Sequence, residues 1–290
     1  MTLAALPDIM LEPQVRAALL EDLGRAGDIT TDAIVPADLV SRVVLTARDA
    51  GVVAGLDLAR LAFCLVDPRL HFTTHLPDGS RVGAGDIIAS VEGPARGILM
   101  GERVALNYLC HLSGVASATS RLVHAVRHTS ARICCTRKTI PGLRSVQKYA
   151  VRAGGGSNHR FGLDDAVLIK DNHIAMAGGV AVAILRARES VGHLVKIEVE
   201  TDTLAQLQEG LSVGADAFLL DNMTPPMLRE AVSMINGRAI AEASGRVTPE
   251  TAVVIAEAGV DLISAGWLTH SVTVLDIGLD YVEAAASRIG

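Results

Sequence analysis

Six short apolar segments recur in the second half of this chain, and helix-like sequence separates each from the next. Such alternation is typical of a parallel β-sheet, because a parallel strand pair needs a long, usually helical, crossover connection. The expected strands are 133–136, 166–170, 195–200, 217–221, 239–242 and 262–265. This half of the chain should therefore form either an α/β barrel or an open sheet with helices on both faces.

The residues at the ends of these segments favour the barrel. An open sheet concentrates its ligand site at one switch point, whereas a barrel brings every carboxyl strand end to one mouth. All six segments end in polar residues or glycine, namely Arg137, Lys170, Glu200, Asp221, Ser244 with Gly245, and Gly266. We therefore predict an α/β barrel of the TIM type with its site at that mouth.

The stretch 136–173 holds seven Lys or Arg against three acids, in a chain whose formal net charge is -6. Arg137, Lys138 and Lys170 each follow an apolar run, so they should lie at strand ends rather than on a solvated face. Several cations at strand ends predict a multiply anionic ligand, such as a carboxylate or a phosphate.

Other basic residues have an ordinary structural explanation. Arg144, Lys148 and Arg152 are spaced four residues apart, which favours a solvated helix face. Arg103 lies within a helix-like segment, and on this pattern alone an exposed surface position is favoured.

Charged residues also alternate along one expected strand, because Lys196, Glu198 and Glu200 share one face. In a strand buried on both faces they must meet an interior polar site or pair with each other. Farther along, Thr248-Pro249 is a suitable start for a helix after the fifth strand. The last two strand-to-helix loops are then expected to bind phosphate through backbone N–H groups.

The first half of the chain mixes helices and strands without regular alternation, which predicts a small α+β domain. The expected helices are 6–23, 56–66, 97–109 and 115–128, with Ser113-Gly114 between the last two, and the expected strands are 42–46, 70–76 and 87–92. We divide the chain into an N-terminal α+β domain with a helical connection, residues 1–112, and a barrel domain, residues 113–290.

Composition excludes several classes of partner. The chain is acidic and only 3% aromatic, which argues against a nucleic-acid surface. It shows neither a signal-like N-terminus nor an apolar run of about 18 residues, so no membrane partner and a cytoplasmic location are expected. Four cysteines without Cys-x-x-Cys spacing are interpreted as reduced residues.

Three motifs in the cationic stretch carry a resemblance: Thr136-Arg137-Lys138-Thr139, then His159-Arg160, then Lys170-Asp171-Asn172-His173. At this spacing they resemble quinolinate phosphoribosyltransferase, the carboxylating nicotinate-nucleotide pyrophosphorylase. The resemblance implies an incomplete α/β barrel after a small α+β N-terminal domain. It also implies condensation of quinolinate with phosphoribosyl pyrophosphate to nicotinate mononucleotide, pyrophosphate and CO2, a step of NAD biosynthesis.

The resemblance also assigns roles to residues, which are expectations here. Around the quinolinate carboxylates and the pyrophosphate it places Arg103, Thr136, Arg137, Lys138, His159, Arg160 and Lys170. It places Glu200 and Asp221 at the ribose and its magnesium, and these two with Lys138 are the expected catalytic residues. The 5′-phosphate loops are Ser244, Gly245, Arg246, Ala265 and Gly266. Two residues depart from the smaller residues that are usual in the family: Arg246 in the first of these loops and Trp267 in the second.

The implied cofactor is Mg2+ bound with phosphoribosyl pyrophosphate, with no direct protein ligand assigned. The implied assembly is a homodimer in which Arg103 enters the neighbouring site, with a hexamer as the larger alternative. Three other readings remain open. They are the family's paralogue associated with molybdate transport, a barrel lyase using Lys170 or Lys196 as a Schiff base, and a non-catalytic anion binder.

Overall fold

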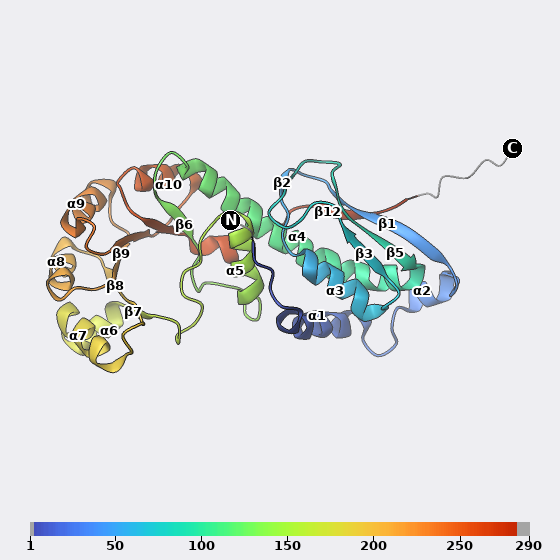
Figure 1. Cartoon of the computed structure of the whole chain (residues 1–290), viewed down its shortest axis with the longest axis horizontal. Helices are drawn as coiled ribbons and strands as arrows, with labels where there is room; N and C mark the ends of the chain where they lie inside the picture. Colours follow the sequence, from blue (N-terminus) through green and yellow to red (C-terminus); the bar gives the residue numbers. More distant parts are fainter. Residues whose placement is uncertain (1–2, 283–290) are drawn as a thin grey trace. The chain divides into compact units, whose positions relative to one another are not determined.

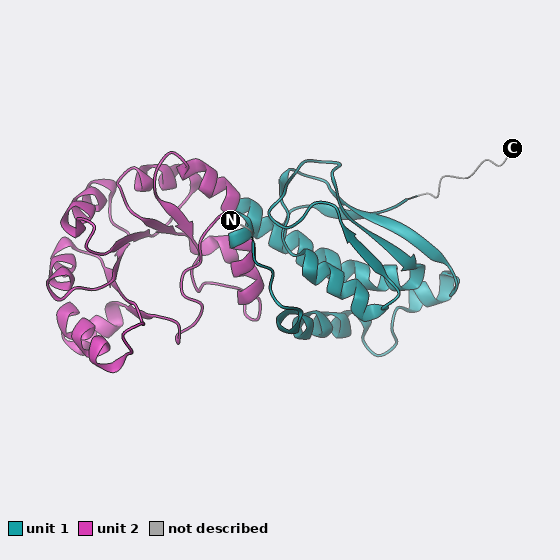
Figure 2. Cartoon of the chain, in the orientation of Figure 1, with its two compact units in different colours: residues 1–118, 152–154, 272–290 teal, residues 119–151, 155–271 magenta. Residues whose placement is uncertain are grey.

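The computed structural model describes residues 3–282, which form two compact units (Figure 2). Unit 1 comprises the described residues up to Ala118, then 152–154 and those from Val272 onward, and unit 2 comprises 119–151 and 155–271. Among residues 3–282, no helix is both long enough and apolar enough to cross a bilayer.

Unit 1 is an α+β unit built on an antiparallel sheet of order β12-β1-β5-β3. Its strands are β1 (Val40–Ala47), β3 (His71–Thr74), β5 (Ile87–Pro94) and β12 (Ile277–Tyr281), with β2 (Gly51–Val52) and β4 (Arg81–Val82) in a separate pair. Its helices are α1 (Asp8–Leu23), α2 (Ile29–Ile34), α3 (Leu56–Val66) and α4 (Ala95–Val126), the last of which continues into unit 2.

Unit 2 contains a six-stranded parallel sheet of order β6-β11-β10-β9-β8-β7. The strands are β6 (Arg132–Cys134), β7 (Val167–Ile169), β8 (Ile197–Thr201), β9 (Ala217–Asp221), β10 (Ile240–Ser244) and β11 (Leu262–Ser264). The helices are α5 (Arg144–Ala153), α6 (Asp171–Ala177), α7 (Val180–Ser190), α8 (Leu204–Val213), α9 (Pro225–Ile235) and α10 (Pro249–Ala256), followed by the 3-10 turn η1 (Gly266–Thr269).

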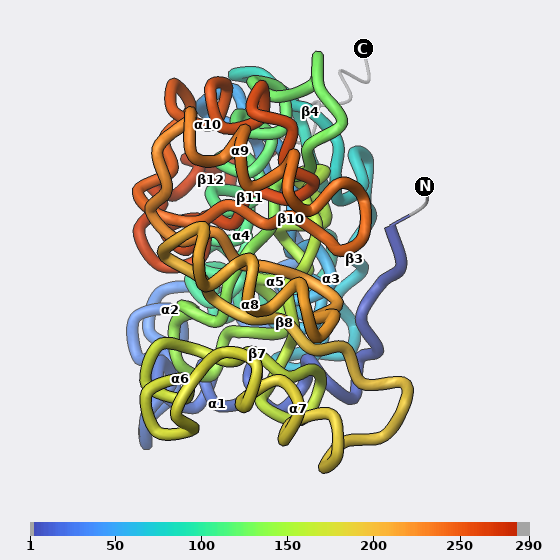
Figure 3. Tube along the Cα trace, turned by 90° about the vertical axis from the view of Figure 1, so that its left-hand side faces the viewer, coloured from blue at the N-terminus to red at the C-terminus, as the bar shows by residue number. Residues whose placement is uncertain are grey.

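The sheet of unit 2 curves into an arc with helices on its outer side, and β6 and β7 are not paired with each other (Figure 1). Helices α7 to α10 follow one another along this outer side (Figure 3). Close packing joins the layers: a Cβ on Gly210 of α8 would lie 2.6 Å from the buried Phe218 ring of β9. The predicted incomplete barrel after an α+β unit is confirmed, and its six strands lie where the apolar segments predicted them.

The prediction of two helices around Ser113-Gly114 is wrong, because α4 runs through both residues without a break. Both residues are packing positions. The Ser113 hydroxyl donates to the Ala54 carbonyl at 3.3 Å and accepts from the Ala54 amide at 3.0 Å. A Cβ on Gly114 would collide with the Thr273 backbone. A small residue here allows another backbone to approach the helix closely.

The compact units interleave along the chain, whereas a single division after residue 112 was predicted from the sequence. Strand β12 pairs antiparallel with β1, with Val43 opposite Tyr281 and Ala47 opposite Ile277. The segment that follows the barrel therefore completes the sheet of unit 1. Its own sequence gave no indication of which sheet edge it would join.

Candidate active site

A cavity of about 650 Å³ opens at the carboxyl ends of the strands of unit 2. Thirteen of the predicted site residues line it: Thr136, Arg137, Lys138, His159, Arg160, Lys170, Glu200, Asp221, Ser244, Gly245, Arg246, Ala265 and Gly266. Further lining residues, which sequence analysis did not assign to the site, include Asn222, Glu242, Trp267 and His270. The lining comes wholly from unit 2, while Arg103 is exposed on α4 in unit 1.

One wall of the cavity carries two neighbouring guanidinium groups. Arg160 donates from Nη1 to the Ala166 carbonyl at 2.7 Å, while the buried Nε atoms of Arg160 and Arg137 have no hydrogen-bond partner among the described residues. Burial, and then the positive charge of Arg137, hold the pKa of Arg160 below its ordinary value. The two guanidinium groups repel each other, and each has an N–H donor without a partner among the described residues. An anion bound between them would accept these donors and offset the repulsion.

Lys138 also lines the cavity, and two hydrogen bonds hold its backbone in place. Its amide donates to the Thr136 hydroxyl at 3.0 Å, and its carbonyl accepts from the Thr269 hydroxyl at 2.7 Å. Its side chain passes close to Gly266, where an added Cβ would lie 2.9 Å from the Lys138 Cδ. Gly266 therefore leaves room for the exposed lysine side chain.

Lys170 and Glu200 form an ion pair, with 2.6 Å between Nζ and Oε2. Lys170 follows β7, and Glu200 lies near the end of the adjacent β8, so parallel pairing of these strands brings the two together. Lys196 is 76% exposed in its side chain, pairs with Asp216 at 2.7 Å, and does not line the cavity. Both lysines considered for a Schiff base are therefore paired with carboxylates.

Asp221 is fixed by two donors. The strand register sets it opposite Ser244, whose hydroxyl donates to Asp221 Oδ1. The Asn222 side-chain amide donates to Oδ2 at 2.7 Å. These two hydrogen bonds hold both oxygens of the Asp221 carboxylate in place.

The loops after β10 and β11 are tied to each other. The Trp267 indole N–H donates to the Val247 carbonyl at 2.7 Å, so this departure from the family pattern anchors one loop to the other. Gly245 has φ 105° and Arg246 has φ 40°, a backbone turn that an L residue rarely adopts. Thr248 then caps α10 by accepting from the Thr251 amide at 3.2 Å.

Lys148 does not lie on a solvated face, so that interpretation is wrong for this residue. It is only 2% exposed, and its Nζ donates to Cys135 Sγ at 3.1 Å and to the His159 carbonyl at 2.9 Å. Lys148 thus fixes the backbone that carries His159. The four-residue spacing of charges could not distinguish this inward lysine from the exposed Arg152 on the same helix.

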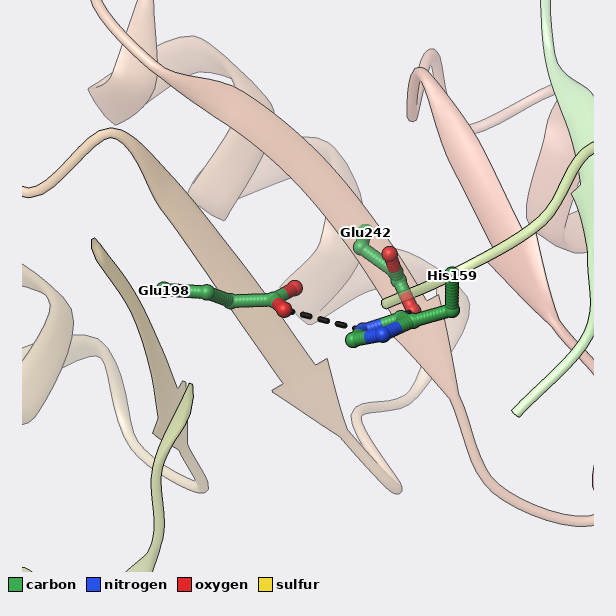
Figure 4. Close-up of side chains that lie close together, drawn as sticks. All are labelled: His159, Glu198 and Glu242. Carbon is green, nitrogen blue, oxygen red and sulfur yellow. Dashed lines mark ion pairs between the residues drawn. The ribbon is translucent and has the colours of Figure 1, made fainter. Parts of the chain in front are cut away.

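The side chains of His159, Glu198 and Glu242 converge (Figure 4), and two of them, His159 and Glu242, also line the cavity. His159 Nε2 lies 2.9 Å from Glu198 Oε2 of β8 and 3.7 Å from Glu242 Oε1 of β10. One imidazole nitrogen of His159 and one carboxylate oxygen from each of Glu198 and Glu242 all lie within 4.8 Å of one another. Burial, and secondly the charge of Glu198, raise the pKa of Glu242 to about 7. The alternation of charges in the sequence predicted an inward face for Glu198, whereas no sequence signal indicated a role for Glu242.

We expect the stability of Glu242→Gln, measured relative to wild type, to be more favourable at pH 8 than at pH 5. The pKa of Glu242 is raised by folding, so its contribution to stability is present below about pH 4.5 and is lost as pH rises through about 7. Between pH 5 and 8, the variant's free energy of unfolding should gain about 1 to 3 kcal/mol relative to wild type. Urea unfolding at both pH values measures this change, and Glu230→Gln, at an exposed position, is the control. The prediction is contradicted if the variant and the wild type differ in free energy of unfolding by the same amount at both pH values.

Two family profiles cover most of the chain. The quinolinate phosphoribosyl transferase N-terminal domain matches residues 28–113, and the C-terminal domain of that family matches residues 115–280. A probable nicotinate-nucleotide pyrophosphorylase [carboxylating] of Bacillus subtilis (strain 168) is 42% identical over 94% of this chain and 93% of its own length. The corresponding protein of Mycobacterium leprae (strain TN) is 45% identical over 92% and 95%.

Solved structures agree with these sequence matches. The crystal structure of NadC from Streptococcus pyogenes has a TM-score of 0.92 and 40% identity, covering 97% of this chain and all of that one. The nicotinate-nucleotide pyrophosphorylase of Francisella tularensis also gives a TM-score of 0.92, at 36% identity, covering 97% and 99%. Both units of the fold are therefore shared with these proteins.

Proposed function

This chain belongs to the quinolinate phosphoribosyltransferase family, and we propose that its cavity joins quinolinate to the phosphoribosyl group of phosphoribosyl pyrophosphate. The products are nicotinate mononucleotide, pyrophosphate and CO2. The observation that carries this proposal is the division of one cavity into a cationic wall, a pair of carboxylates and two glycine-containing loops. Each part suits a different portion of the two substrates.

The cationic wall suits quinolinate, a small ring with two carboxylates. Arg137 and Arg160 keep unused buried donors, and Lys138 extends beside them, so two anionic groups can each be bound by charge-assisted hydrogen bonds. The loops around Gly245 and Gly266 suit the 5′-phosphate, because backbone near a glycine can approach an anion closely.

Glu200 and Asp221 suit the ribose. Displacement at its anomeric carbon builds positive charge like that of an oxocarbenium ion, which fixed carboxylates stabilise. Asp221 is held by Ser244 and Asn222, and Glu200 by Lys170, so neither must reorganise as this charge develops. The cationic side chains thus bind the ring carboxylates, while the two carboxylates stabilise positive charge at the reacting carbon.

We propose that Mg2+ enters with phosphoribosyl pyrophosphate. Carboxylate oxygens are the hard ligands that this ion accepts, and Glu200 and Asp221 supply them on adjacent strands of the cavity. When bound, Mg2+ would neutralise charge on the leaving pyrophosphate. The loss of magnesium should then be tested by binding of phosphoribosyl pyrophosphate as well as by turnover.

Nicotinate should be a poor substrate, because it lacks one of the two ring carboxylates. Binding it would leave part of the Arg137 and Arg160 wall desolvated and without an anion. We expect kcat/KM for nicotinate to be at least about a hundredfold lower than for quinolinate. Initial rates with each acid at saturating phosphoribosyl pyrophosphate measure the ratio. Equal rates would indicate a different phosphoribosyltransferase.

We propose further that the enzyme is a homodimer in which Arg103 completes the partner's site. The family resemblance supports this arrangement, and so does the exposure of Arg103 outside the residues that line the cavity. We also propose a cytoplasmic location, which fits the free state of Cys64, Cys110, Cys134 and Cys135.

Mixing Arg103→Ala with Lys138→Ala subunits tests the shared site. Each variant alone should be inactive, whereas each hybrid dimer would hold one site with both cations and one with neither. Random exchange should restore activity to at most about one quarter of wild type. If exchange is demonstrated and activity does not return, Arg103 acts within its own chain or outside the site.

A further inference from the structure

His159, Glu198 and Glu242 together offer more hydrogen-bond acceptors than they have protons to donate. His159 Nδ1 accepts the backbone N–H of Arg160 at 2.8 Å. Glu198 and Glu242 favour a charged imidazole, and they raise the pKa of His159 although burial opposes them. A second ring proton, however, would sit on Nδ1, where its N–H would point at the Arg160 backbone N–H, and neither group could accept a hydrogen bond from the other. The geometry therefore holds His159 neutral, with one proton on Nε2.

The Nε2–H group donates its hydrogen bond to Glu198, because Nε2 lies 2.9 Å from Glu198 Oε2 and 3.7 Å from Glu242 Oε1. Glu242 is only 2% exposed, and its Oε1 has no hydrogen-bond partner among the described residues. A buried carboxylate oxygen without a donor is costly, and binding a proton removes that cost.

The surroundings of Glu242 favour the same state. Burial and then the charge of Glu198 on β8 favour the neutral acid, with a smaller effect from Cys135 beyond β6, while His159 and the Ser264 hydroxyl of β11 oppose them. The two other acids that line the cavity each accept a hydrogen bond from a neighbouring side chain, Glu200 from Lys170 and Asp221 from Asn222. Of the three, Glu242 is the one with a buried oxygen that lacks a hydrogen-bond partner among the described residues.

We propose that Glu242 is a neutral carboxylic acid in the resting site and gives its proton to the ring carbon from which the carboxylate leaves. The inference rests on the proposed function, because only a decarboxylating reaction needs such a proton. It gives Glu242 a catalytic role and makes Glu198 a positioning residue that acts through His159 and through its charge.

The step balances without another reactant. The bond between the ring carbon and its carboxylate breaks, CO2 leaves, and the electron pair stays on the carbon beside the ring nitrogen. The O–H bond of Glu242 then breaks as its proton forms the new C–H bond. Glu242 is left as a carboxylate and takes a proton from water before the next turnover. A proton donor beside the carbon also stabilises the negative charge that develops there.

Glu242→Gln separates this step from the transfer of the phosphoribosyl group. In a single turnover with quinolinate labelled in its 2-carboxylate, pyrophosphate should form within about threefold of the wild-type rate. Release of CO2 should slow at least about tenfold, so that the undecarboxylated mononucleotide accumulates. Glu230→Gln, an exposed change on α9, should release both products at the wild-type rate. Equal slowing of both products, or no slowing of CO2, overturns the proposal; absence of pyrophosphate in the wild type instead defeats the proposed function.

Glu198→Gln gives a second test that does not depend on the first variant folding. The amide oxygen can still accept the His159 N–H, but the negative charge that opposes ionisation of Glu242 is removed. Glu242 should therefore lose its proton at lower pH, and the alkaline limb of kcat/KM for quinolinate should move to lower pH. A merely structural role would lower the profile without moving that limb. An unmoved limb, or one displaced to higher pH, contradicts the proposal.

Discussion

Arg160→Ala should lower kcat/KM for quinolinate by about two to three orders of magnitude while the protein remains folded. The guanidinium lies on a half-buried wall beside Arg137, and the proposed carboxylate contact is a charge-assisted bond away from bulk water. Removing one such contact costs about 2 to 4 kcal/mol of transition-state stabilisation. Steady-state kinetics with quinolinate as the varied substrate measures the effect.

Two further variants make this result specific. Lys138→Ala should show a loss of similar size, because its ammonium extends into the same cavity. Arg152→Ala removes an exposed cation from the same stretch of sequence, outside the cavity, and should be close to wild type. Near-normal kcat/KM in Arg160→Ala and Lys138→Ala would remove these residues from the substrate site.

Asp221→Asn and Glu200→Gln should each lower kcat by about a hundredfold or more. The amides keep the shape of the side chains but remove the negative charge proposed to stabilise the ribose cation in the transition state. Because that charge develops only during reaction, kcat should fall more than KM for phosphoribosyl pyrophosphate rises. Asp202→Asn, an exposed change after β8, is the matched control.

The outcome distinguishes two roles for these carboxylates. A fall in kcat with little change in KM supports stabilisation of the reacting carbon. A rise in KM alone would mean that Glu200 and Asp221 bind the substrate and the transition state equally well. Asp221 also accepts from Ser244 and Asn222, so circular dichroism and thermal unfolding of its variant must match the wild type.

Sequence predicted the barrel unit well because its signals are local. Each strand is an apolar run, and the polar residue that follows it must lie at the sheet edge where parallel strands end. Strand register then accounts for contacts such as that of Asp221 with Ser244. These contacts follow once the order of strands is known, although no short motif contains both residues.

The features that sequence did not predict depend on contacts between distant segments. Ser113 and Gly114 have poor helix propensity, but their close packing against Ala54 and Thr273 keeps α4 continuous. Strand β12 pairs with β1 across more than two hundred residues of sequence. The neutral state expected for Glu242 arises from burial and from Glu198, and neither is visible in the residues beside it.

The most direct test of the central claim is incubation of the purified protein with quinolinate, phosphoribosyl pyrophosphate and Mg2+. Products are separated by chromatography and identified by mass. We predict formation of nicotinate mononucleotide, with one CO2 and one pyrophosphate released for each molecule formed. Failure to form any mononucleotide, together with trapping of a keto substrate on Lys170 or Lys196 by borohydride, would contradict the assignment and indicate a Schiff-base lyase instead.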